Sequence, residues 1–176
     1  MRHGSIRWYG ERLNSGRIER LATLGLGLTH PVSKRSIVFT PEGFDADFDP
    51  DELSALLTSA HGEITFGLWL THSSNVVVTV SGSAQHGLNV FSLDGLDFEE
   101  QDRVCAAVLW VASHDRGARL VVADDYLDDF VDSEPDAWDA YVAGIAGRPP
   151  IVPKLLFERD ATGHFRVEYA PDSWHL

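Results

Sequence analysis

The sequence predicts a single α+β domain in which a mixed, mostly antiparallel sheet packs against two to four helices. Three observations support this prediction. Two segments begin with helix N-cap signals, three alternating or apolar runs lie between them, and a further alternating run surrounds a glycine near the C-terminus. The length of 176 residues, with 44% hydrophobic residues, is enough for one domain with a hydrophobic core.

The N-terminal segment, residues 1–33, is basic and contains several glycines, and its apolar residues show only patchy periodicity. We expect a basic N-terminal arm or a short helix with weak packing there, followed by an acidic α+β domain over residues 34–176. Within that domain, residues 35–40 are expected to form a strand. Residues 41–50 are expected to form a loop.

The first helix of the domain has a clear start signal. Asp49 is the expected N-cap, Pro50 the first helical residue and Glu52 the third, and Gly62 ends the pattern. Such a helix should lie half buried, because one stripe of it is apolar: Leu53, Leu56, Leu57 and Ala60.

Three runs follow, at residues 63–71, 75–81 and 86–93. Apolar side chains alternate along the first two, and the links between the runs are short and rich in serine, glycine and asparagine. This spacing predicts an antiparallel meander.

A second helix is predicted from Asp97 as N-cap and Glu100 at the third helical position, with a broad apolar face that ends near Gly117. Residues 119–123 are expected to form a short buried strand. A third helix is expected to begin at Ser133, and residues 154–170 should form a hairpin around Gly163.

The formal net charge of −13 is unevenly distributed. Residues 1–35 contain seven basic and two acidic residues, a sum of +5, whereas the remaining residues sum to −18. An acidic body repels nucleic-acid phosphate and anionic membranes, so we expect no nucleic acid and no membrane among the partners. A basic protein partner is the better electrostatic match. The single cysteine, Cys105, favours a cytoplasmic location.

The most acidic stretch is "DDYLDDFVDSEPDAWD", which starts at Asp124 and places eight carboxylates in sixteen positions. Aspartates interleaved with aromatic residues are typical of a protein-binding surface directed at a basic partner. The alternative interpretation is a solvated, turn-rich edge. The predicted partner-binding residues come from this stretch and from the segment before the first helix: Asp124, Asp125, Tyr126, Asp128, Asp129, Phe130, Asp132, Asp45 and Asp47.

A metal site is the other chemistry that this stretch could support. The string "DDYLD" resembles the aspartate-rich motif of prenyl-diphosphate enzymes over five residues, but those enzymes are large and all-helical, so their activity is not carried over. What remains is a Mg²⁺ site formed by Asp124, Asp125 and Asp128 after a strand. A calcium loop starting at Asp45 fails, because Pro50 stands where glycine is needed and Leu56 where glutamate is needed.

Three functional hypotheses follow. The favoured one is a non-catalytic acidic binding protein that occupies a basic site on a protein partner, as immunity proteins that block nuclease toxins do; it needs no cofactor and no catalytic residue. The second is a divalent-metal-dependent enzyme that acts on phosphate esters. In the third, the chain forms a homo-oligomer in which the basic N-terminal arm docks on the acidic body of a neighbour.

Overall fold

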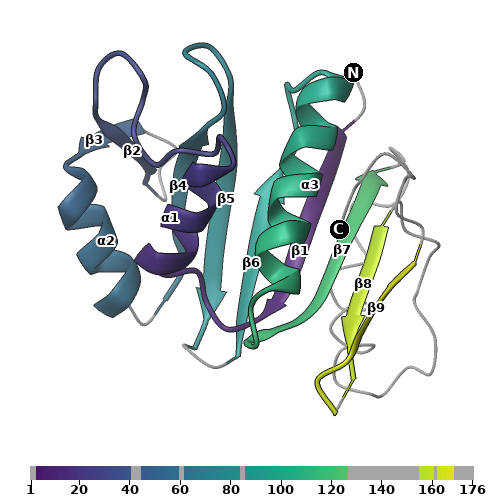
Figure 1. Ribbon diagram of the computed structural model, residues 1–176. Coiled ribbons are helices and arrows are strands. Elements are labelled where there is room, and N and C mark those ends of the chain that lie inside the picture. The colour runs from purple at the N-terminus through teal and green to yellow at the C-terminus, as the bar shows by residue number, and fades with distance from the viewer. Residues whose placement is uncertain are drawn as a thin grey trace.

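The computed structural model describes residues 3–40, 45–59, 62–83, 86–126, 155–160 and 162–168. Within this part of the chain, nine strands form one sheet in the order β3-β2-β4-β5-β6-β1-β7-β8-β9, and each neighbouring pair is antiparallel (Figure 1). The predicted α+β fold class is therefore confirmed. The strands are β1 His3–Gly10, β2 Ser36–Phe39, β3 Asp45–Phe48, β4 Ile64–Trp69, β5 Asn75–Gly82, β6 Gly87–Ser92, β7 Ala118–Tyr126, β8 Leu155–Arg159 and β9 Phe165–Glu168.

Three helices among the described residues cover one face of this sheet, as Figure 1 shows: α1 Ser15–Thr23, α2 Pro50–Ser59 and α3 Phe98–Ser113. α1 packs against both α2 and α3, and α3 packs against β7. No helix in these residues is long and apolar enough to cross a membrane.

The two predicted helix starts are confirmed. The Asp97 carboxylate accepts a hydrogen bond from the Glu100 N–H, and the Glu100 carboxylate accepts one from the Asp97 N–H, which makes a complete capping box for α3. At α2, the Asp49 carboxylate accepts a hydrogen bond from the Asp51 N–H at 2.9 Å. Both starts are set by local chemistry, so the sequence predicts them well.

The predicted meander corresponds to β4, β5 and β6. Its alternation is also confirmed, because the residues that face the helices are buried on β4 and β5: Ile64, Phe66, Leu68, Val76, Val78 and Val80. The predicted C-terminal hairpin corresponds to β8 and β9, which pair antiparallel around Gly163 at a φ of +86°.

The N-terminal segment, expected to be an arm or a short helix, contains the strand β1 and the short helix α1. β1 lies inside the sheet, paired with β6 on one side and β7 on the other, and α1 is capped by the side chain of Asn14. Both faces of β1 are buried, so polar Ser5 and Arg7 are buried along with Ile6 and Trp8. A strand buried on both faces lacks the alternation of apolar and solvated residues, which is why the sequence pattern does not reveal it.

Part of the expected loop over residues 41–50 is also a strand. β3 pairs with β2 and forms the last strand at one side of the sheet. The expected helix from Ser133 lies outside the described residues.

Candidate functional site

Acidic residues from three separate segments gather at one edge of the sheet. Because neighbouring strands are antiparallel, β3, β4, β6 and β7 run in the same direction and their carboxyl ends share an edge. α2 starts after β3, α3 starts after β6, and positions 124 and 125 lie in the last part of β7. We call this the acidic edge and define it by Asp47, Asp49, Asp51, Glu52, Asp94, Asp97, Glu99, Glu100 and the backbone positions 124 and 125.

The helix starts explain why so much negative charge is tolerated at this edge. The N-terminus of a helix carries a partial positive charge that stabilises nearby carboxylates. Glu100 is further held by the Ser74 hydroxyl, which donates to it at 2.6 Å. Asp97 and Glu100 therefore serve the helix cap, whereas Asp94 and Glu99 are exposed to solvent.

One large apolar side chain stands among these carboxylates. Phe98, the first residue of α3, is 62% exposed and lies between Asp97 and Glu99 in the chain. Sequence reasoning missed it, because helical spacing aligns Phe98 with buried Gln101 and Cys105 and thus with the core stripe. An exposed aromatic side chain with acidic residues on both sides of it in the chain is suited to contact a partner that is both basic and partly apolar.

The start of α3 and the end of β7 lie on either side of the start of β1. Position 125 pairs with Gly4 of β1, and the Leu93 N–H donates a hydrogen bond to the Gly4 carbonyl at 2.8 Å. Asp94 is the next residue after Leu93. The carboxylates that precede α3 therefore lie two strands away from positions 124 and 125, across β1.

The predicted partner-binding residues are placed as follows. The backbone at positions 124, 125 and 126 belongs to β7, where it pairs with Ser5, Gly4 and His3. Asp128, Asp129, Phe130 and Asp132 lie outside the described residues.

Asp45 and Asp47 belong to β3, at the far side of the sheet. Six strand spacings of about 4.8 Å separate β3 from β7, which amounts to about 29 Å. Basic residues also lie near β3, since the Arg35 guanidinium donates to the Asp47 carbonyl at 3.3 Å and Lys34 is exposed. The β3 segment is therefore a separate part of the acidic edge with mixed charge.

The Mg²⁺ hypothesis gains no geometric support from β7. This strand is antiparallel to both β1 and β8, so the rule that ligands gather at the carboxyl ends of parallel strands does not apply. The described residues contain no group of three histidine, cysteine or acidic side chains arranged to hold a metal ion. Because Asp128 lies outside the description, the hypothesis stays a prediction, to be tested by a Mg²⁺-dependent rise in melting temperature that Asp125→Asn abolishes.

The opposite edge of the sheet holds a partly buried cluster of charged side chains, which we call the arginine end and define by Glu11, Arg12, Arg17, Arg20, Asp115 and Arg159. A network of ion pairs lies within it and joins Arg17 to Glu11 and Asp115, and Arg20 to Asp115. Arg17 is 5% exposed, and its guanidinium donates through Nε and Nη2 to both oxygens of Asp115 and through Nη2 to Glu11. Arg20 donates to the same Asp115 carboxylate at 3.1 Å. This network ties α1 to the segment between α3 and β7.

The network shifts the pKa of both central groups. Burial raises the pKa of Asp115, but hydrogen bonds from Arg17 and the Gly117 N–H, with the charges of Arg17 and Arg20, outweigh it and hold that pKa below its usual value. For Arg17, burial lowers the pKa, and the hydrogen bonds and charges of Asp115 and Glu11 raise it further than burial lowers it. Both groups are therefore charged in the folded protein at neutral pH.

These contacts change the interpretation of the basic N-terminal segment. Residues 1–33 contain five basic residues, and three of them, Arg7, Arg12 and Arg17, are buried within the chain's own fold. They are not available to dock on the acidic body of a neighbouring copy. The positive charge that the sequence places at the N-terminus serves in large part to hold the domain together.

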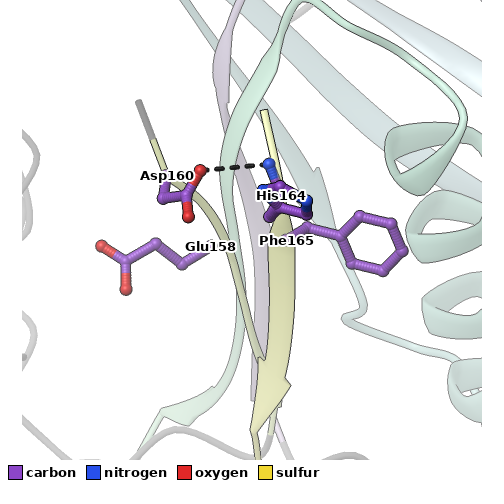
Figure 2. Close-up of a pocket in the computed structure, with 4 residues that line it drawn as sticks. All are labelled: Glu158, Asp160, His164 and Phe165. Atoms are coloured by element: carbon purple, nitrogen blue, oxygen red, sulfur yellow. Dashed lines mark hydrogen bonds between the residues drawn. The ribbon is translucent and has the colours of Figure 1, made fainter. Parts of the chain in front are cut away.

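A pocket of about 390 Å³ lies on the β8–β9 hairpin, lined by Glu158, Asp160, His164 and Phe165 (Figure 2). One Asp160 oxygen accepts hydrogen bonds from the Thr162 N–H, the Thr162 hydroxyl and the His164 N–H. The Thr162 hydroxyl makes the largest contribution to a lowered pKa of Asp160. Figure 2 shows Glu158 and Phe165 pointing to opposite sides. The polar side chains of this pocket do not point toward a common centre, and the Asp160 carboxylate stabilises the turn between β8 and β9.

Comparisons with protein families, with curated proteins and with solved structures find no match to this chain. The functional interpretation therefore depends on the geometry of the molecule alone.

Proposed function

We propose that this protein is a non-catalytic acidic binding protein of the inhibitor or immunity type, which occupies a basic site on a protein partner. The binding surface in this proposal is the part of the acidic edge around the start of α3, together with the acidic stretch that begins at the end of β7. We keep the cytoplasm as the expected location.

The observation that supports the proposal is the setting of Phe98. This side chain is exposed, and carboxylates precede and follow it in the chain, including Asp94, Asp97 and Glu99. At the same time, Arg12 and Arg17 are buried at the arginine end, at the opposite edge of the sheet. The surface thus combines a strong negative field with an apolar anchor.

The two features would act at different steps of binding. A net charge of −13 attracts a basic protein over long range and raises the association rate, an effect that salt screens. An aromatic side chain that enters a pocket of the partner slows dissociation, because burying it removes apolar surface from water. An inhibitor that blocks a cationic active site needs both properties.

The experiment uses wild-type protein and two variants as bait for basic proteins. The double variant Asp94→Lys with Glu99→Lys reverses two charges beside Phe98. Glu63→Lys, the matched control, changes an exposed carboxylate just before β4, at the opposite edge of the sheet. We expect the wild type and Glu63→Lys to recover the same basic protein and the double variant to lose it.

Binding kinetics then test the mechanism with the recovered partner. The association rate constant should fall on the order of tenfold or more between low and physiological salt, and Phe98→Ala should mainly raise the dissociation rate constant. Recovery by the double variant, or an association rate that does not respond to salt, would rule out this surface.

A further inference from the structure

Arg12 is a buried cation at the arginine end that is held in place by backbone carbonyls. It follows β1, is 5% exposed, and donates through Nη1 to the carbonyl oxygens of Gly62 at 2.9 Å and Gly82 at 2.8 Å. Both glycines have positive φ, of +146° for Gly62 just before β4 and +81° for Gly82 at the end of β5. The guanidinium plane is therefore oriented by two independent segments.

The stem of the Arg12 side chain is equally constrained. A Cβ atom added at Gly87 would lie 2.7 Å from Cγ of Arg12 and 2.8 Å from its backbone nitrogen, so only glycine allows β6 to approach this closely. The next residue, Leu13, donates its N–H to the Asn89 side chain at 2.8 Å. Arg12 is thus preorganised by β6, by the end of β5 and by the segment before β4.

The rest of the guanidinium differs from that of Arg17. Nε and Nη2 of Arg12 are buried and have no hydrogen-bond acceptor among the described residues, whereas the same two atoms of Arg17 donate to Asp115 and Glu11. Arginine side chains keep their charge at all ordinary pH values, and buried polar groups in folded proteins are almost always satisfied. Because the Nε–Nη2 edge of Arg12 is buried without an acceptor in the described part of the chain, we infer that an acceptor from outside the chain can bind there.

We propose that the Nε–Nη2 edge of Arg12 binds a small oxyanion, namely a carboxylate or a phosphate group. The two N–H bonds on this edge are parallel and match a pair of oxygens on one central atom. The proposal is independent of the proposed function, since Arg12 lies at the opposite end of the sheet from the acidic edge.

The test measures the melting temperature of the full chain in sodium phosphate, sodium acetate and sodium chloride at constant ionic strength and pH. We expect a saturable rise over chloride of about 3–6 °C at ten times the dissociation constant. A rise with phosphate alone identifies a phosphate group as the ligand, and a rise with acetate as well identifies carboxylates. Equal melting temperatures in all three salts would overturn the proposal.

Two variants show whether the effect belongs to Arg12. Arg12→Gln should lose the anion-dependent rise, whatever its melting temperature in chloride. Arg116→Gln, an exposed arginine at the same end of the sheet, should keep it. A rise that persists in Arg12→Gln would assign the anion to another site and overturn the proposal.

A measurement on the wild type alone covers the case in which Arg12→Gln does not fold. In an NMR titration with phosphate or acetate, the Nε–H resonance of Arg12 should shift with the same dissociation constant as the melting data. Titration without a shift of that resonance would contradict the proposal.

Discussion

The two ends of the sheet treat charge in opposite ways. At the arginine end, Arg17 and Asp115 are both 5% exposed and are joined by two hydrogen bonds. Their charges therefore neutralise each other in the interior of the fold. At the acidic edge, Asp94 and Glu99 are exposed and lie close to Phe98 in the chain. The partial positive charge at the helix starts stabilises these carboxylates. The first arrangement stabilises the domain, whereas the second leaves a negative field in the solvent. Substitutions at the two ends should therefore affect different properties.

The largest effect is expected at Asp115. Asp115→Ala leaves Arg17 buried without its main partner, and removing one member of a buried ion pair costs about 3–5 kcal/mol of unfolding free energy. Urea denaturation at pH 7 measures the loss. A cost below about 1 kcal/mol would mean that solvent replaces Asp115 easily and that the two ends do not differ as described.

The pH dependence of stability sharpens the same contrast. The pKa of Asp115 is lowered in the folded protein, so its contribution is fully present above the usual aspartate pKa of about 4 and is lost as pH falls through the folded value. The difference in unfolding free energy between wild type and Asp115→Asn should therefore shrink from pH 5 downward. Urea denaturation at several pH values measures it, and a constant difference would contradict the assigned pKa shift.

A smaller loss is expected at the cap of α3. Asp97→Ala removes the side chain that accepts the Glu100 N–H, which should cost about 1 kcal/mol of unfolding free energy. Asp97→Asn is the matched control, because asparagine is an equally good N-cap, and it should stay close to wild type in thermal unfolding. Equal losses in both variants would show that the charge of Asp97, rather than its capping hydrogen bond, stabilises the helix.

The smallest change in stability is expected at Glu99. Glu99→Gln removes one exposed carboxylate and should alter the unfolding free energy by less than about 0.5 kcal/mol. The same variant should nevertheless lower the association rate constant for a basic partner, because it weakens the field at the acidic edge. Stopped-flow association at low salt measures this effect. A change in the unfolding free energy without a change in the association rate constant would contradict the assignment of Glu99 to partner binding.

Local signals explain how much of the fold could be predicted. The starts of α2 and α3 follow from Asp49 and Asp97, whose side chains bond to backbone groups two or three residues away. The meander follows from the alternation of apolar residues, which is also local. β1 could not be predicted in the same way, since burial of both faces depends on segments far away in the chain.

The candidate site shows the same division. The sequence revealed an acidic body and an acidic stretch from Asp124, but only the sheet topology brings the residues before α3 next to that stretch across β1. The exposure of Phe98 was also invisible, because helical periodicity gives the angular position of a residue on its helix and not whether another element covers it.

By itself, the sequence determined the fold class, the helix starts, the alternating strands and the sign of the surface charge, because these depend on neighbouring residues and on composition. The tertiary structure decided which charged side chains are paired in the interior of the fold and which face solvent. Arg17 and Asp115 are 98 positions apart, and their pairing requires the α1 start and the α3 end to meet at one end of the sheet. Electrostatic energy depends on distance in space and on burial, and neither follows from the order of charges along the chain.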